Sequence, residues 1–285
     1  MRRRLAGVAA AIGLVLSGGL LTATPAAAVD SGFSQAGATQ HLTTEEVAQF
    51  AKQIETELAG QGARVAIVFR SGRAREDLPE GISYTHGAFW VYQTINLSDG
   101  TQAPGYAVYN LYHGSGDQQL VSSLVQDFPF DFVAGTAVDD VAVIVPTPEM
   151  QRRILAIMAS PDYEALHNPA YSLISNPLDL RYQNCNEFML DVVAAAAWGT
   201  TDREQIKANL RAHFTPTPVR VGGFERLFGP VVDQRLRTDD HRGQRIATTT
   251  YESMAAFMLD NRLASRAYTL QRDPAFVFAN PAAES

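Results

Sequence analysis

The sequence predicts one α+β domain with a C-terminal extension. Short runs rich in β-branched and aromatic residues alternate with segments whose apolar residues recur at helical spacing. The chain has 285 residues, of which 46% are hydrophobic and 19% are charged. This composition is typical of a globular protein with a sizeable core. No clear linker divides the chain beyond its N-terminal leader, so one domain is the simplest organisation.

Residues 1–28 are expected to be a secretory signal peptide. Arg2, Arg3 and Arg4 precede an apolar stretch that contains glycines, and the small residues 26–28 offer a cleavage site. The mature protein would then be exported, periplasmic or extracellular, without a stable membrane span. Loss of the three arginines takes the net charge from −7 to −10. An acidic chain without a basic stripe disfavours nucleic-acid partners.

The next elements follow from periodicity and turn signals. Residues 29–62 are read as a leader and a helix, because apolar residues recur on one helical face of 43–58 and Thr43 or Thr44 can cap it. The turn sequence NLSDG joins two of the later strands into an antiparallel hairpin. The remaining elements are strands at 63–70, 82–93, 105–114 and 140–146, and a helix at 148–160.

The second half of the chain begins with turns at two Asn-Pro pairs, 168–169 and 176–177. A helix is predicted from Cys185 to about Trp198, ended by Gly199. Further elements are a helix at 202–214 and a strand followed by a helix within 245–261. These elements divide the chain after residue 62 into a core, 63–200, and a C-terminal extension, 201–285.

Cys185 is the single cysteine of the chain. A free thiol is a liability in an oxidising compartment, so it invites a functional explanation, although a buried cysteine often merely fills space. Asn184 and Glu187 form an Asn-x-x-Glu pattern related to the capping box, which places Cys185 at the first helical position. Backbone N–H groups at a helix start favour a thiolate, so a lowered pKa is expected. The same N–H groups can stabilise an oxyanion.

A thiolate nucleophile needs a base, and His86 and His113 are the candidates because both lie in the predicted hairpin. A turn centred between Asp99 and Gly100 would place them opposite each other, where His113 could orient His86. A slip of two residues would bring Leu111 there. A slip of one would turn His113 to the other face and bring Asn110 or Tyr112 instead. The other four histidines lie in leader, turn-rich or surface-type segments.

Six sequence stretches carry a resemblance to known proteins, and together they span roughly residues 63–200. The order of a histidine strand followed by a cysteine helix resembles the circularly permuted branch of the NlpC-type, papain-like cysteine hydrolases. More specifically, the chain is similar to an exported bacterial family of unknown function, family 2145. The stretches are YTHGAFWVY, VYNLYHG, QDFPFDF, VIVPTPEMQ, YSLISNP and YQNCNEF.

The resemblance implies a papain-like fold in which a small antiparallel sheet packs on the nucleophile helix. It implies Cys185 as nucleophile and His86 as general base, with His113 in the third position. Asn110 is the alternative third residue, and Tyr84 or Tyr182 could supply an oxyanion donor. Asp127 and Asp131, in QDFPFDF, could lie on a lip of the cleft, but a solvated loop without a role in the site is the favoured interpretation.

The function expected from these residues is cysteine-dependent hydrolysis or acyl transfer on an amide, peptide or acyl-ester bond, possible substrates being cell-wall peptides or lipids. The substrate itself, whether small molecule, peptide or lipid, is unknown. The alternative is an exported binding or assembly module that keeps the fold without turnover. No cofactor is expected. No metal site is expected either, since the two hairpin histidines lack a third ligand with suitable spacing.

Overall fold

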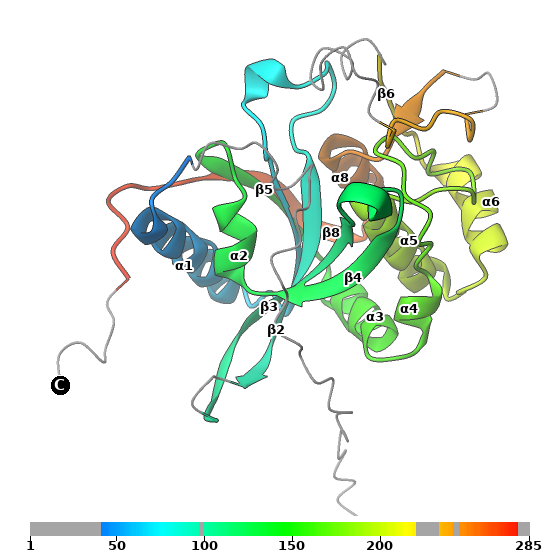
Figure 1. Ribbon diagram of the computed structural model, residues 1–285. Helices are drawn as coiled ribbons and strands as arrows, with labels where there is room; N and C mark the ends of the chain where they lie inside the picture. The colour runs from blue at the N-terminus through cyan, green and yellow to red at the C-terminus, as the bar shows by residue number, and fades with distance from the viewer. Residues whose placement is uncertain (1–40, 97–99, 221–233, 242–244, 279–285) are drawn as a thin grey trace, which may run out of the picture.

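The computed structural model describes residues 41–96, 100–220, 234–241 and 245–278. The predicted signal peptide, 1–28, and most of the predicted leader lie outside these residues. The described chain forms an α+β domain, which confirms the predicted class (Figure 1). Within the described residues there are seven α-helices and a six-stranded antiparallel sheet.

The sheet has the strand order β4-β3-β2-β1-β5-β8. The first three strands in the chain, β1, β2 and β3, lie side by side in that order, as short antiparallel connections favour. The strand that completes the sheet, β8, comes from the end of the described chain and pairs with β5. The strands are β1 Val65–Arg70, β2 His86–Asn96, β3 Gln102–His113, β4 Ser122–Asp127, β5 Asp140–Pro146 and β8 Ala264–Gln271.

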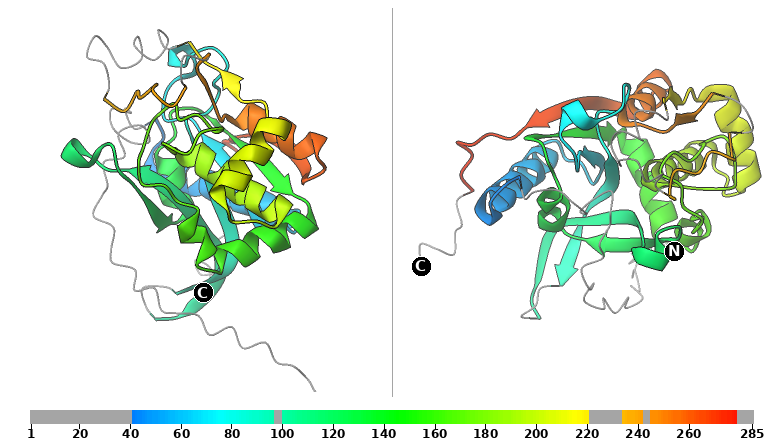
Figure 2. Two further views of the ribbon diagram at one scale, coloured as in Figure 1. Left: turned by 90° about the vertical axis from the view of Figure 1, so that its right-hand side faces the viewer. Right: turned by 45° about the horizontal axis from the view of Figure 1, so that its top comes forward.

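Helices cover both faces of the sheet (Figures 1 and 2). One face, called the α1–α2 face, packs on α1 Thr44–Gly60 and α2 Pro129–Ala134. The opposite face, called the α5 face, packs on α5 Cys185–Trp198 and its neighbouring helices. The remaining elements are α3 Pro148–Met158, α4 Asp162–Ala165, α6 Arg203–His213, α8 Tyr251–Asp260, the short strands β6 Thr217–Pro218 and β7 Ala247–Thr248, and two 3₁₀ turns, Arg75–Asp77 and Gly116–Gln118.

Two hydrophobic clusters fill the spaces on either side of the sheet, and β2 divides its side chains between them. Ala88 and Trp90 belong to the cluster on the α1–α2 face. Phe89 and Val91 belong to the cluster on the α5 face. This alternation is the expected consequence of the two-residue period of a strand. Residues adjacent in the chain near the start of β2 therefore face different layers, which matters for the site.

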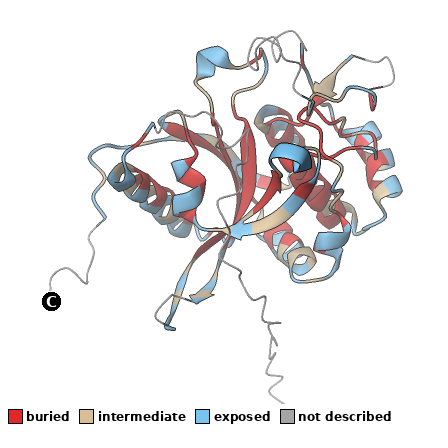
Figure 3. Cartoon of the chain, in the orientation of Figure 1, coloured by how far each residue is buried: buried red, intermediate tan, exposed pale blue. Residues whose placement is uncertain are grey.

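Helix α5 is buried around nearly its whole circumference from Cys185 to Ala196 (Figure 3). Its bounds, Cys185–Trp198, are those predicted from the sequence, and Gly199 ends it in the left-handed conformation with a φ of 65°. Glycine adopts this conformation without the steric cost of a Cβ atom. The cysteine-bearing helix is thus the central helix of the α5 face, with its N-terminus fixed inside the protein.

The predicted hairpin exists, but its predicted register is wrong by one residue. Phe89 pairs with Tyr109 and Tyr92 pairs with Tyr106. Continued to the start of β2, this register places Tyr112 opposite His86, and their rings stack with centroids 5.1 Å apart. A shift of one residue reverses the face of every side chain. His113 consequently turns away from the face that carries His86.

Candidate active site

Cys185 is the first residue of α5 and follows the N-cap residue, Asn184, whose backbone and side chain are held by hydrogen bonds. Asn184 Oδ1 accepts a hydrogen bond from the Glu187 N–H at 2.9 Å, and its Nδ2 donates to the Leu173 carbonyl at 3.1 Å. The Asn184 N–H itself donates to Ser175 Oγ at 3.1 Å. The second half of the predicted capping pattern is absent, because the Glu187 carboxylate binds Lys207 instead of returning to Asn184. These bonds hold the start of α5, and so Cys185, in one place.

The thiol of Cys185 is only 6% exposed, and burial raises its pKa above the ordinary value. The N–H groups of Gly87, Asn186 and Cys185 and the charge of Arg70 oppose this rise without reversing it. The expectation of a lowered pKa is therefore wrong, because desolvation of the thiolate outweighs the helix start. The sulfur donates to Asn186 Oδ1 across 3.7 Å.

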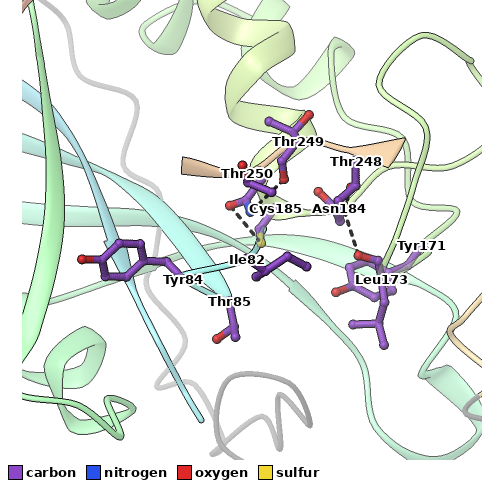
Figure 4. A pocket seen from close by; sticks show the side chains of 11 residues that line it. Ile82, Tyr84, Thr85, Tyr171, Leu173, Asn184, Cys185, Thr248, Thr249 and Thr250 are labelled. Carbon is purple, nitrogen blue, oxygen red and sulfur yellow. Dashed lines mark hydrogen bonds between the residues drawn. The ribbon is translucent and has the colours of Figure 1, made fainter. Parts of the chain in front are cut away.

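A small cavity of about 30 Å³ lies beside Cys185, large enough for one or two water molecules. Side chains from four separate parts of the chain surround it (Figure 4). The segment before β2 and the start of α5 supply two walls. Tyr171 and Leu173 supply a third. The last wall comes from the C-terminal region, as three consecutive threonines, Thr248, Thr249 and Thr250.

His86 lies on the α1–α2 face of the sheet. Its ring stacks on Tyr112 and lies 5.8 Å, centroid to centroid, from Phe132 of α2. Its Nε2 atom lies 2.9 Å from Asn110 Oδ1. Burial lowers the pKa of His86 to about 3, with the charge of Arg70 as the second cause. The imidazole is therefore neutral at physiological pH.

Asn110 is itself oriented by Asp127, the last residue of β4. The Asn110 Nδ2 atom donates to Asp127 Oδ2 at 3.2 Å. With its amide nitrogen turned to the carboxylate, Asn110 presents its oxygen to His86, which must then donate from Nε2. The ring lone pair is left on Nδ1. Asp127 was expected on a solvated loop. It instead ends a strand and is partly buried, which raises its pKa.

The other predicted site residues have partners of their own. The His113 Nδ1 atom lies 2.6 Å from the Gly114 carbonyl, and its Nε2 atom lies 3.0 Å from Arg235 Nη1. The Tyr84 hydroxyl donates to Asp140 Oδ1 at 2.9 Å, although Tyr84 is one of the residues that line the cavity. The Tyr182 hydroxyl donates to Asp239 at 2.9 Å. Tyr182 does not line the cavity beside Cys185.

The predicted residues thus form two groups. Cys185 and Tyr84 line the cavity, whereas His86 and Asn110 are bonded to each other on the α1–α2 face. Within the described residues, no hydrogen bond joins the Cys185 sulfur to the His86 ring. The two groups approach through the backbone, because one of the three N–H groups that act on the sulfur belongs to Gly87, the residue after His86.

Sequence reasoning missed three contributors to this region. The threonines 248–250 lie far along the chain from Cys185, and only the run of three identical polar residues could have drawn notice. Arg70 is wholly buried beside His86 on β1. Lys207 is wholly buried between Glu187 and Asp191, at 2.7 Å from a carboxylate oxygen of each. The four-residue spacing of Glu187 and Asp191 on one helix was the available signal for this cluster.

Lys207 connects α6 to the cysteine-bearing helix. Its two carboxylate partners both lie on α5, and burial raises the pKa of Glu187 to about 8. Two carboxyl groups share one ammonium in a dry environment, so Glu187 carries a proton more readily than a solvent-exposed glutamate. Asp191 also accepts a hydrogen bond from Gln183 Nε2 at 2.8 Å. The cluster fixes α5 from the side opposite the sheet.

Across the described ranges, no cluster of three or more His, Cys, Asp or Glu side chains has the arrangement of a metal site. In the same ranges, no helix has both the length and the apolar character needed to cross a bilayer.

Comparison with known proteins gives one match. Neither a curated protein nor a solved structure matches the chain significantly. A family described as an uncharacterized protein conserved in bacteria, DUF2145, matches residues 57–258. The match includes both groups of site residues and continues through the three threonines of the cavity wall. The chain belongs to this DUF2145 family.

Proposed function

We propose that the protein is an exported cysteine-dependent hydrolase or acyltransferase with a permuted papain-like fold. Cys185 is the nucleophile, His86 is the general base and Asn110 orients the base. The observation that carries the proposal is the hydrogen bond of 2.9 Å between His86 Nε2 and Asn110 Oδ1. Since Asp127 fixes the amide, this bond leaves the basic lone pair on His86 Nδ1.

The proposed reaction begins when the Cys185 sulfur attacks the carbonyl carbon of an amide, peptide or acyl ester. The thiol proton passes to His86 Nδ1, and the N–H group of Cys185 at the helix start receives the developing oxyanion. His86 returns the proton to the leaving amine or alcohol, and the acyl group stays on sulfur as a thioester. Water or a second acceptor then releases the acyl group, with His86 again taking and returning the proton.

The resting protein holds a protonated thiol and a neutral histidine on different faces of the sheet. The proposal therefore requires a rearrangement on substrate binding that brings His86 Nδ1 to the thiol, in the way that lids and loops complete other active sites. The small cavity supports the same requirement, because 30 Å³ does not hold a substrate. The chain order, with the histidine strand β2 ahead of the cysteine helix α5, supports the permuted relation to papain-like enzymes.

Thiol alkylation as a function of pH tests the proposal. The folded protein is treated with iodoacetamide between pH 5 and 10, alongside His86→Gln, Asn110→Ala and His213→Gln. His213 is exposed and serves as the matched control. We expect reactivity below pH 8 that falls at least about tenfold in His86→Gln, as expected for loss of a general base. A thiol that is inert below pH 8, or whose profile ignores His86, would contradict the proposal. Thermal unfolding of each variant identifies any that fail to fold.

The second candidate is an exported binding or assembly module without turnover. Two observations favour it: burial raises the pKa of Cys185, and His86 is packed between aromatic rings away from the cavity. In that case Cys185→Ser would retain ligand binding, and the alkylation profile would follow that of an ordinary buried thiol. The pH series distinguishes the two candidates, since only the hydrolase requires His86 for thiol reactivity.

A further inference from the structure

His113 has no role in the proposed reaction, but its surroundings are specific. The residue is 3% exposed and lies on the α5 face of the sheet, which it shares with Leu111, two residues earlier on β3. Each ring nitrogen has a close neighbour. The Nδ1 atom lies 2.6 Å from the Gly114 carbonyl, and the Nε2 atom lies 3.0 Å from Arg235 Nη1.

These two contacts determine the protonation state of the His113 ring. An arginine side chain donates hydrogen bonds and does not accept them, so Nε2 must present its lone pair to Arg235. A carbonyl oxygen only accepts, so Nδ1 must carry the proton that Gly114 receives. The ring is therefore neutral in this arrangement. A second proton on Nε2 would remove the hydrogen bond from Arg235 and place two positive groups 3.0 Å apart.

Arg235 belongs to the described segment 234–241, which packs on the loop that precedes α5. The Arg235 carbonyl accepts from the Leu173 N–H at 2.9 Å and from Ser172 Oγ at 3.3 Å. The Arg237 carbonyl also accepts from Ser172 Oγ, at 3.0 Å. Asp239 and Asp240 hold the far half of the segment through bonds from Arg181, Tyr182 and Asn176. The near half, 234–237, is thus held by the loop on one side and by His113 on the other.

The loop that Arg235 contacts also forms one wall of the cavity beside Cys185. Tyr171 and Leu173 line this wall (Figure 4). The His113 ring lies 5.0 Å, centroid to centroid, from the Tyr171 ring. The Leu173 carbonyl accepts from Asn184 Nδ2 at 3.1 Å, while its N–H donates to Arg235. Leu173 therefore connects the segment to the cap of the cysteine-bearing helix.

We propose that His113 and Arg235 form a pH-sensitive latch, which holds residues 234–237 against the cavity wall and is released when His113 is protonated. A histidine free in water takes up a proton near pH 6.5, whereas the latched ring does so only by losing its hydrogen bond with Arg235. The released state therefore binds more protons, and acid shifts the equilibrium toward release by at most about tenfold per pH unit. The latch stands apart from the proposed function, but its role as a gate to Cys185 rests on that function.

Other titratable groups lie near the latch and respond at different pH values. Ser122 of β4 pairs with His113, and Tyr171 contacts its ring; hydroxyl groups of both kinds stay neutral between pH 5 and 8. His86, on the opposite face, lies within range of the charge of His113, but its own pKa of about 3 keeps it neutral at these pH values. Asp240 differs, because burial raises its pKa and it holds the far half of the segment. Its titration must be separated from that of His113.

Hydrogen exchange of the Leu173 amide, which donates to the Arg235 carbonyl, measures the latch. Exchange is followed by mass spectrometry between pH 7.5 and 5.5 and corrected for the intrinsic pH dependence of the reaction. We expect the protection of Leu173 to fall about three- to tenfold as the pH decreases below 6.5. The Tyr92 amide, which donates to the Arg64 carbonyl, is the internal reference, because global unfolding in acid would expose both amides alike.

Three substitutions separate His113 from its neighbours. His113→Gln keeps an acceptor for Arg235 and cannot be protonated, so the protection of Leu173 should become independent of pH. Arg235→Gln removes the charge that a protonated His113 would meet and should have the same effect. Asp240→Asn removes the other buried group that titrates in acid and should keep the parent response. Thermal unfolding at pH 7.5 shows whether each variant stays folded.

A Leu173 response that is absent from the parent protein, persists in His113→Gln and Arg235→Gln, or disappears in Asp240→Asn would overturn the latch. The gate is tested by the iodoacetamide rate of Cys185, divided by the rate in His113→Gln at the same pH. This ratio should rise as the protection of Leu173 falls. A constant ratio would retain the latch and remove the gate. A rising ratio in a protein whose alkylation does not depend on His86 would retain the latch and contradict the nucleophile assignment.

Discussion

His86 Nε2 and Asn110 Oδ1 lie 2.9 Å apart on the buried α1–α2 face, and Asp127 holds the other end of the Asn110 amide. This chain of two hydrogen bonds fixes which ring nitrogen of His86 carries the proton. It also gives the neutral polar side chain of Asn110 a definite orientation, since an amide that donates to a carboxylate has only its oxygen left for the histidine. The position of the proton on the His86 ring can therefore be measured directly.

The first prediction concerns the tautomer of His86. We expect a neutral ring with its proton on Nε2 at pH 7, because Asn110 accepts from that atom and burial keeps the pKa low. Long-range ¹H–¹⁵N NMR spectra of the histidine rings report the tautomer. In Asp127→Asn, the Asn110 amide loses its fixed orientation, and a mixture of the two tautomers is expected. An Nδ1–H tautomer in the parent protein would remove Nδ1 as the basic atom.

The second prediction concerns stability at acidic pH. The pKa of His86 falls from 6.5 to about 3 on folding, so the unfolded chain binds the proton first as the pH decreases. The stabilisation by neutral His86 is fully present above pH 6.5 and is lost progressively as the pH falls toward 3. The slope from this one group is at most about 1.4 kcal/mol per pH unit.

Urea unfolding between pH 7 and 4 measures this contribution. The difference in slope between the parent protein and His86→Gln isolates the histidine from the carboxyl groups that titrate in the same range. His213→Gln, which changes an exposed histidine, should keep the parent slope. Equal slopes in the parent and His86→Gln would mean that His86 is protonated as easily in the folded state as in the unfolded state.

The local features of α5 could be predicted from the sequence. Asn184 as cap, Cys185 as first residue and Gly199 as terminator are short-range signals, and all three are present in the structure. The pKa direction of Cys185 could not be predicted in the same way, because it depends on how deeply tertiary packing buries the helix start. The face of His86 depends on the register of a hairpin, and one residue of error reverses it.

The outer parts of the sheet were not predicted. Strand β8 has polar, exposed residues at four of its eight positions, as an edge strand does, and so lacks a clear hydrophobic signal. Strand β4 and helix α2 are six residues each, and they follow one another closely in the chain. No linker segment in the sequence marks where the strand ends and the helix begins. The cavity wall at threonines 248–250 meets Cys185 only because the C-terminal region folds back on the α5 face. Contacts of this range leave no periodic pattern in the sequence.

The third prediction concerns the buried ion cluster behind α5. Lys207→Met removes the ammonium group that Glu187 and Asp191 share, and it leaves two carboxyl groups in a fully buried site. We expect a loss of about 3–5 kcal/mol in the free energy of unfolding at pH 7, as for other broken buried pairs. Lys52→Met is the control, because the exposed Lys52 pairs with Glu55 at the surface and its replacement should cost at most about 1 kcal/mol. Similar losses for the two variants would show that the cluster does not stabilise α5.

The fourth prediction concerns Gly87, which lies between the base and the nucleophile helix. A Cβ atom at Gly87 would overlap Met189 Cε of α5 and the Phe69 ring of β1. The methionine end can move, but the ring is wholly buried and Gly87 faces the helix that carries Cys185. We expect Gly87→Ala to destabilise the protein by about 1–3 kcal/mol through overpacking and to slow alkylation of Cys185. Gly60→Ala is the control, because a Cβ atom there meets no atom within 4 Å. Chemical denaturation and iodoacetamide rates of both variants check the prediction. An alanine at position 87 that changes neither quantity would mean that α5 and β2 are packed less closely than the contacts of Gly87 indicate.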